Sequence, residues 1–253
     1  MRFLPLLPIL LLAISGCRLH AGAPERPQPV VAGYSQDVEV DSERGRIRIT
    51  ELTRGLENPW SLALLPDGDM LVSERPGRLL KLDAKGNLLA QIEGLPTIFV
   101  DGQAGLLDVV PAPDFASSKL VYLSFAKPNL RGNLAGTAVF RARLEGNALV
   151  DGKVIYEQEP KLSSGTHVGS RLVFDGRGHL FVTQGENNKR PTAQDLDKLQ
   201  GKLVRLNLDG SIPADNPFVG REGVRPEIWS YGHRNMQGGA LNPWSGQVWT
   251  SEH

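Results

Sequence analysis

Apolar and polar residues alternate along three separate segments of the chain, and each segment ends in a glycine turn. Alternation with a period of two is typical of a β-strand that buries one of its faces. Aligning Lys81, Arg141 and Arg205, which lie 60 and 64 positions apart, also brings the closing glycines into register. The pattern therefore predicts a repeated unit. Its alternating segments are residues 77–86, 137–147 and 201–210.

A second pattern precedes each of these segments. It consists of an apolar run, a turn rich in Pro, Asp and Gly, and a second apolar run, which together predict a β-hairpin. A further short strand is expected after each alternating segment, so a complete repeat supplies four strands. The hairpins are residues 60–74, 103–125, 167–186 and 237–252, and the following strands are residues 87–94, 148–158 and 226–232.

Four strands that recur at near-constant spacing predict an all-β fold, a β-propeller built of four-stranded blades. In a propeller each sheet packs against its neighbours, so a single repeat does not fold alone. The alternative is an all-β sandwich whose segments resemble one another by accident. The chain covers about four blades. Because the fourth repeat ends after two strands, an open sheet edge is expected there.

The loops that lead into the first strand of each repeat, here termed approach loops, carry polar or aromatic side chains. The first strand of a propeller blade lines the central channel, so these loops open on one face around the axis. Residues far apart in the sequence are therefore expected to meet at one end of the central channel, here termed the mouth. The group comprises Trp60, Gln103, His167, Arg234, Asn235 and Gln237.

Small residues surround His167, which leaves room for a flat ligand near the backbone. A lone histidine is more often structural, but here the equivalent positions in the other repeats are also polar. An imidazole is a suitable base for a hydroxyl proton at neutral pH. Arg234 offers fixed donors for carboxylate or quinone oxygens. We therefore interpret His167 as one element of a convergent site.

The composition argues against one class of partner, and the N-terminal sequence indicates where in the cell the protein is located. With 28 basic and 28 acidic residues the formal net charge is zero, so nucleic acid is not expected as a partner.

Residues 1–16 have a positive start, an apolar run and small residues before Cys17, as in a bacterial lipoprotein signal. A plain secretory peptide is the alternative. We expect a lipidated cysteine and flexible tether in residues 17–45, and the propeller, incomplete at its C-terminus, in residues 46–253.

Five blocks of the sequence, taken together and in order, resemble the soluble-type sugar dehydrogenases that depend on pyrroloquinoline quinone (PQQ). The similarity is greatest to the bacterial aldose sugar dehydrogenases and covers nearly all of residues 52–253. The blocks are LENPWSLALLPDGDMLVSERPGRL, DGQAGLLDVVPAPDF, SSGTHVGSRLVF, AQDLDKLQGKLVRLNLDGSIPADNPF and YGHRNMQGGALNP.

The resemblance implies a six-bladed propeller with PQQ and calcium on the axis. It implies that His167 takes the proton from the anomeric hydroxyl while hydride passes from C1 to the quinone, giving a lactone. By the same resemblance Arg234 holds the quinone, Gln103 lies near the substrate, and Asn235 and His253 contact the cofactor. Thr166 replaces an aspartate of some relatives, so substrate contacts need not carry over. The calcium ligands are expected beyond residue 253, and these 253 residues alone are expected to give little turnover with PQQ and calcium.

The sequence thus predicts a PQQ- and calcium-dependent oxidoreductase that acts on aldoses and passes electrons to an unidentified acceptor. We expect a periplasmic protein whose contact with the outer membrane is a lipid on Cys17. Two alternatives remain: a propeller lactonase with an axial metal ion, and a non-enzymatic binding propeller in the periplasm. The lactonase would need carboxylates in the approach loops, where the chain places Gln103, His167 and Arg234.

Overall fold

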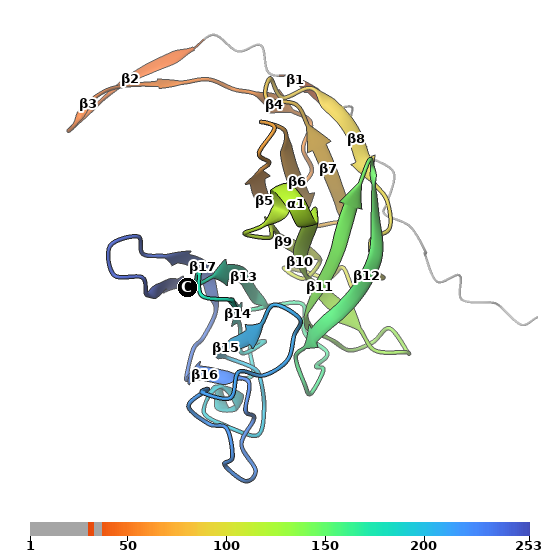
Figure 1. The fold of residues 1–253 in the computed structure, drawn as a ribbon, viewed down its shortest axis with the longest axis vertical. Helices are drawn as coiled ribbons and strands as arrows, with labels where there is room; N and C mark the ends of the chain where they lie inside the picture. Colours follow the sequence, from red (N-terminus) through yellow and green to blue (C-terminus); the bar gives the residue numbers. More distant parts are fainter. Residues whose placement is uncertain (1–29, 33–36) are drawn as a thin grey trace, which may run out of the picture.

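The computed structural model describes residues 30–32 and 37–253, and their sheets follow one another around an arc (Figure 1). The predicted signal segment, Cys17 and most of the tether lie outside the described residues. Blade 1 comprises β5 (Pro59–Leu64), β6 (Met70–Glu74), β7 (Arg78–Leu82) and β8 (Leu88–Ile92), and blade 2 comprises β9 (Leu106–Pro111), β10 (Leu120–Pro128), β11 (Ala135–Glu145) and β12 (Ala148–Glu157). Blade 3 comprises β13 (Gly169–Phe174), β14 (His179–Gln184), β15 (Lys202–Asn207) and β16 (Ile228–Tyr231), and blade 4 comprises β17 (Met236–Leu241) and β18 (Val248–Glu252).

Each of blades 1 to 3 is an antiparallel sheet in which strands pair in chain order. Two short helical segments interrupt the strands: α1 (Phe115–Ser118) between β9 and β10, and the 3-10 helix η1 (Arg190–Ala193) between β14 and β15. The prediction of an all-β propeller with four-stranded blades is confirmed. Within the described residues blade 4 has two strands, also as expected.

The repeat register read from the sequence is also confirmed. Lys81, Arg141 and Arg205 occupy the third strand of their blades, opposite Leu71, Tyr122 and Phe181 of the second strand, respectively. The aligned glycines have positive φ angles of 85°, 57° and 91°, a conformation that glycine adopts without steric cost. These glycines are Gly86, Gly146 and Gly210.

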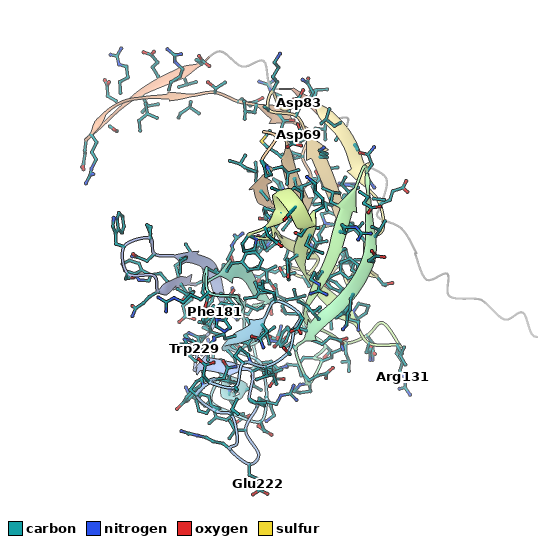
Figure 2. The ribbon with its side chains drawn as sticks, viewed as in Figure 1. Asp69, Asp83, Arg131, Phe181, Glu222 and Trp229 are labelled. Atoms are coloured by element: carbon teal, nitrogen blue, oxygen red, sulfur yellow. The ribbon has the colours of Figure 1, made fainter. Side chains whose placement is uncertain are left out.

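The hydrophobic core lies between the blades. On β10, Leu123 and Phe125 pack toward blade 1, whereas Tyr122 packs with blade 3. On β14, Val182 packs with blade 2, whereas Phe181 packs with Leu203 of its own blade and with Met236 of blade 4. Middle strands are therefore buried on both faces and read as nearly continuous apolar runs. Phe181 also meets Trp229 edge to face, with ring centroids 5.5 Å apart (Figure 2).

The first strands β5, β9, β13 and β17 lie side by side, and Arg171 of β13 joins all four. Its Nη1 donates to Asp108 Oδ1 of β9 at 2.9 Å and to Ser61 Oγ of β5 at 3.4 Å, and its Nε donates to the Gln237 carbonyl of β17 at 3.3 Å. The guanidinium also lies over the Trp60 indole, 4.4 Å from the ring centroid. Burial raises the pKa of Asp108, and Arg171 offsets part of that effect. We call these contacts the hub.

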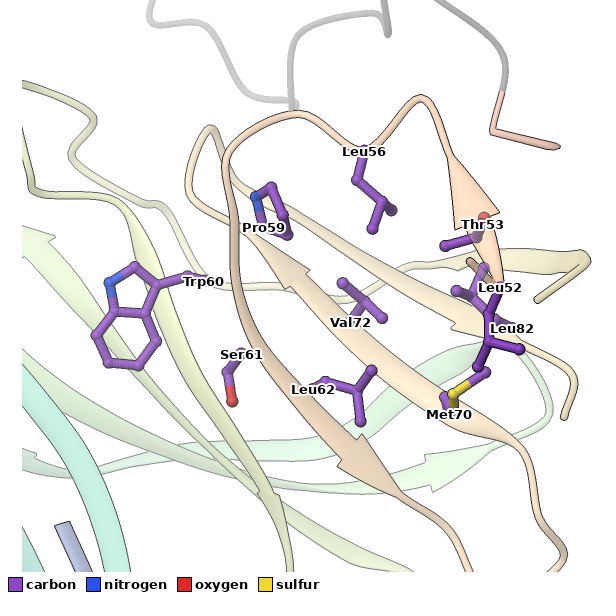
Figure 3. Close-up of a pocket in the computed structure, with 10 residues that line it drawn as sticks. All are labelled: Leu52, Thr53, Leu56, Pro59, Trp60, Ser61, Leu62, Met70, Val72 and Leu82. Atoms are coloured by element: carbon purple, nitrogen blue, oxygen red, sulfur yellow. The ribbon is translucent and has the colours of Figure 1, made fainter. Parts of the chain in front are cut away.

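An apolar cavity of about 230 Å³ lies on the face of blade 1 that is turned away from blade 2 (Figure 3). Leu56, Met70 and Val72 line it, whereas the Trp60 indole projects to the other side of β5, toward the hub. The side chains that line this cavity are almost entirely apolar, and it is not the mouth predicted from the approach loops.

The N-terminal part of the described chain includes a hairpin that projects away from the blades (Figure 1), whereas Val30 packs against Met70 and Leu80 of blade 1. Strands β2 (Val38–Ser42) and β3 (Gly45–Ile49) form an exposed hairpin, and β1 (Val31–Ala32) pairs with β4 (Thr53–Arg54). The boundary expected between tether and propeller at residues 45 and 46 falls inside this hairpin. None of the helices in the described part of the chain has the length and apolar character to cross a bilayer.

Candidate active site

Two approach loops, those of blades 2 and 3, are bound directly to each other. The Gly165 carbonyl accepts hydrogen bonds from the backbone N–H groups of Gln103 at 2.7 Å and Ala104 at 3.1 Å. In return, the side-chain oxygen Oε1 of Gln103 accepts the backbone N–H of His167 at 2.8 Å. The structure therefore brings together Gln103 and His167, which are 64 residues apart in the sequence.

The imidazole of His167 is held by a carboxylate. Nδ1 lies 2.6 Å from Glu186 Oε1, and the side chains of His167 and Glu186 are 12% and 1% exposed. An anionic carboxylate accepts the Nδ1 proton, which leaves the lone pair on Nε2. Nε2 has no hydrogen-bond partner among the described residues. The pair is thus arranged as a base with a fixed ring orientation.

The approach loop of blade 4 joins the same network. Glu186 N–H donates to the Arg234 carbonyl at 2.9 Å, and Asn235 Oδ1 accepts Gly169 N–H at 3.1 Å. Arg234 Nη1 contacts His253 Nδ1 at 2.8 Å, and His253 N–H donates to the Asn235 carbonyl at 3.1 Å. The five residues to which the resemblance gave a role, Gln103, His167, Arg234, Asn235 and His253, therefore lie in one connected network at the mouth. The other two approach-loop residues, Trp60 and Gln237, instead contact Arg171 of the hub. Their roles toward a substrate or cofactor stay predictions.

Glu186 belongs to a recurring arrangement, here termed the glutamate clasp. In three blades a glutamate at or just after the end of the second strand binds the approach loop of its own blade. Glu74 accepts the Glu57 N–H at 2.6 Å, and Glu252 accepts the Arg234 N–H at 2.8 Å. In blade 3 the glutamate instead binds a side chain, the imidazole of His167.

Strained backbone conformations occur around the pair of His167 and Glu186. His167 has φ +48° and Ser170 has φ +96°, and Asn187, next to the clasp glutamate, has φ +53°. Residues other than glycine held in the left-handed region cost about 1–3 kcal/mol each and concentrate at functional sites. Gly185 allows this packing, because a Cβ there would lie 1.7 Å from the His167 carbonyl oxygen.

A cavity of about 380 Å³ borders the network on the side of blade 3. Glu186, Arg190, Gln194 and Arg234 are among the residues that line it. Glu186 Oε2 is buried without a hydrogen-bond partner in the described part of the chain, although Oε1 binds His167. Unpaired buried carboxylate oxygens are costly, so this atom marks a position where a donor from a ligand or water would be stabilised.

Lys202 of β15 anchors the wall of this cavity. Its ammonium group is completely buried and donates to the carbonyls of Thr192 at 2.9 Å, Ala193 at 3.0 Å and Gln200 at 2.7 Å. The Ala193 carbonyl also accepts the Gly232 N–H at 2.9 Å, two residues before Arg234. Lys202 thus fixes η1 and the approach loop of blade 4 relative to each other.

Burial lowers the pKa of Lys202 to about 8 from 10.5, which predicts a pH-dependent stability. Between these two values the unfolded chain binds more protons than the folded one, so the free energy of unfolding rises with pH. We expect a gain of about 2 kcal/mol between roughly pH 7 and pH 9.5. Urea unfolding across this range checks it, and Lys202→Met is the control in which the gain should be absent. Equal pH slopes in both proteins would contradict the expectation.

The donors at the mouth fit an oxygen-rich planar acid such as PQQ. Only Nη1 of the Arg234 guanidinium has a partner in the described part of the chain, so its remaining N–H groups can donate to carboxylate or quinone oxygens. The amide nitrogen of Gln103 is likewise unpaired among the residues described. Across residues 30–32 and 37–253, no group of three or more His, Cys, Asp or Glu side chains is placed to hold a metal ion.

Two features of the site escaped the sequence interpretation. Glu186 is followed by two asparagines, a composition typical of a turn, yet it binds the imidazole of His167. The hub pair of Asp108 and Arg171 was not singled out. The repeats themselves could have pointed to Glu186. When they are aligned, Glu74, Glu186 and Glu252 each end the second predicted strand of their own repeat.

The chain is similar in sequence and in fold to known sugar dehydrogenases. An aldose sugar dehydrogenase, YliI of Escherichia coli strain K12, is 52% identical over 210 residues, covering 82% of this chain and 56% of its own. The apo-form crystal structure of the soluble aldose sugar dehydrogenase from Escherichia coli matches with a TM-score of 0.75 and 54% identity, over 78% of this chain and 58% of that one. A PQQ-bound aldose sugar dehydrogenase from Streptomyces coelicolor matches with a TM-score of 0.69 and 29% identity, over 91% and 62%.

The chain thus spans roughly three fifths of the length of these relatives. The glucose/sorbosone dehydrogenase family profile matches residues 56–253, which include all three complete blades, the β17–β18 hairpin and every residue of the network at the mouth. The chain belongs to the glucose/sorbosone dehydrogenase family.

Proposed function

We propose that the complete gene product is a PQQ-dependent dehydrogenase that oxidises aldose sugars at C1 to lactones. The observation that carries the proposal is the pair of His167 and Glu186 at the mouth, with Nδ1 2.6 Å from the carboxylate and Nε2 left unpaired among the described residues. The similarity to a PQQ-bound aldose sugar dehydrogenase supports the choice of cofactor.

In this proposal each residue of the network has a separate role in the reaction. His167 Nε2 takes the proton of the anomeric hydroxyl, and Glu186 stabilises the imidazolium that forms. Arg234 holds oxygen atoms of the cofactor through its unshared N–H groups, and Gln103 keeps the backbone of His167 in place while offering its amide to the sugar. When bound, PQQ supplies the two-electron acceptor for the hydride that leaves C1.

The remaining elements of the proposal concern the whole protein. Calcium is proposed as a second requirement, with ligands supplied outside the described residues. The protein is proposed to work in the periplasm, tethered to the outer membrane by a lipid on Cys17, and to pass electrons to an acceptor of unknown identity. Asn235 and His253 are proposed to complete the cofactor pocket beside Arg234.

Mixing the complete gene product with PQQ and calcium tests the proposal. We expect a shift of the quinone absorbance that glucose then bleaches, reduction of a dye acceptor, and a lactone detectable by NMR. A PQQ spectrum that does not respond to the protein would favour the binding propeller. Hydrolysis of an added sugar lactone without dye reduction would favour the lactonase.

A further inference from the structure

Three carboxylates lie in the approach loops of blades 2 to 4 or at the ends of the second strands of these blades, and two of them are hydrogen-bonded within the network at the mouth. Glu186 binds His167, and Glu252 binds the backbone N–H groups of Arg234 and Asn235. The third is Asp101, in the approach loop of blade 2. It is exposed, and its side chain makes no hydrogen bond or ion pair to any other residue that the structure describes.

Backbone contacts fix the position of the Asp101 carboxylate. Asp101 and Ala104 pair through their backbones, and the Gly165 carbonyl accepts N–H groups from the same loop. A Cβ on Gly165 would lie 2.3 Å from the Asp101 carbonyl oxygen and 2.6 Å from its Oδ2. The carboxylate therefore rests directly on Gly165, two residues before His167, and a side chain at Gly165 would displace it.

Three other polar side chains in the approach loops of blades 2 and 3, those of Gln103, Ser164 and Thr166, already have partners. The hydroxyl of Thr166 lies 3.1 Å from Ser164 Oγ, and Gln103 Oε1 is taken by the backbone of His167. Asp101 is thus the carboxylate of this loop pair whose oxygen atoms are left for a ligand. Sugars present rows of hydroxyl donors, and a hydrogen bond to a charged acceptor is stronger than one between neutral groups.

We propose that Asp101 binds the sugar hydroxyl on C2, the carbon next to the one that reacts, and so contributes to the choice of substrate. This rests on the proposed oxidation at C1, because it assumes that His167 receives the C1 hydroxyl. The carboxylate accepts the C2 hydroxyl from the side of Gly165, while the imidazole faces the C1 hydroxyl. Asp101 is a binding residue and exchanges no proton.

The test compares wild type with Asp101→Asn in the complete gene product loaded with PQQ and calcium. For glucose we expect KM to rise about ten-fold with kcat changed less than about two-fold, because one charged hydrogen bond is lost. For 2-deoxyglucose, which lacks the hydroxyl, KM should be the same in both proteins. For 6-deoxyglucose, which keeps it, the rise should match that for glucose.

Glu222→Gln is the matched control, because Glu222 is an exposed carboxylate on a remote loop (Figure 2). It should leave all three KM values unchanged, and thermal unfolding should show that both variants fold. Equal KM shifts for glucose and 2-deoxyglucose, or no shift for either, would overturn the role of Asp101 while leaving the proposed function intact. If wild type oxidises no aldose, the proposed function itself fails.

Discussion

Replacing His167 with alanine is expected to lower kcat/KM for aldose oxidation by about 10²- to 10⁴-fold, the usual contribution of a positioned general base. The imidazole is the group at the mouth that combines an unpaired nitrogen with a carboxylate partner, Glu186. The loss should appear mainly in kcat, because the proton is taken during the chemical step. Steady-state kinetics with glucose and a dye acceptor measure it.

The control for this experiment is a second histidine–carboxylate pair in the same blade. His179 Nδ1 lies 2.7 Å from Asp175 Oδ2, and the His179 side chain is partly buried, but the pair lies at the β13–β14 turn, away from the network at the mouth. His179→Ala should therefore leave kcat/KM unchanged within about two-fold. The quinone absorbance shift should persist in His167→Ala. Activity close to wild type in that variant, with cofactor bound, would remove the proposed base.

Replacing Asp108 with alanine is expected to reduce the free energy of unfolding by about 3–5 kcal/mol, as when one partner of a buried ion pair is removed. Asp108 is 1% exposed and accepts hydrogen bonds from Ser61 Oγ at 2.6 Å, Arg171 Nη1 at 2.9 Å and Leu172 N–H at 2.8 Å. Alanine would leave these donors unsatisfied and the guanidinium without its counter-charge. Equilibrium urea unfolding at neutral pH measures the loss.

Asp69→Ala provides the comparison for an ion pair of similar length whose aspartate is more exposed than Asp108. Asp69 Oδ2 lies 2.8 Å from Lys81 Nζ at the outer part of blade 1, with both side chains about one-fifth exposed (Figure 2). Its removal should cost no more than about 1 kcal/mol. If Asp108→Ala proved no more destabilising than Asp69→Ala, the hub would not be an important source of stability.

The blades could be read from the sequence because their determinants are local. The alternation along β7, β11 and β15 and the glycine at the end of each are set by the pleat and by turn geometry. The approach loops could be predicted to meet because the repeat fixes where each first strand begins. That prediction placed Gln103, His167 and Arg234 in a common network, which the structure shows.

The parts that escaped sequence reasoning depend on contacts across blades. Arg171 and Asp108 look like ordinary solvent-facing positions of half-buried strands, and nothing local shows that β5, β9, β13 and β17 place them against one another. Glu186 follows a strand and precedes two asparagines, a composition typical of a turn. The partner of Glu186 lies 19 residues earlier in the sequence and is reached only through the β13–β14 pairing.

The glutamate clasp has a consequence for how a catalytic histidine–carboxylate pair can arise in a β-propeller. Glu74 and Glu252 each accept a backbone N–H of their approach loop, so an acid at this position has a structural role that does not depend on a catalytic one. A mutation that put an imidazole into a neighbouring loop would find its carboxylate already in place. New catalytic dyads could therefore evolve from single substitutions, and the same scaffold could move its chemistry from one blade to another without altering a sheet.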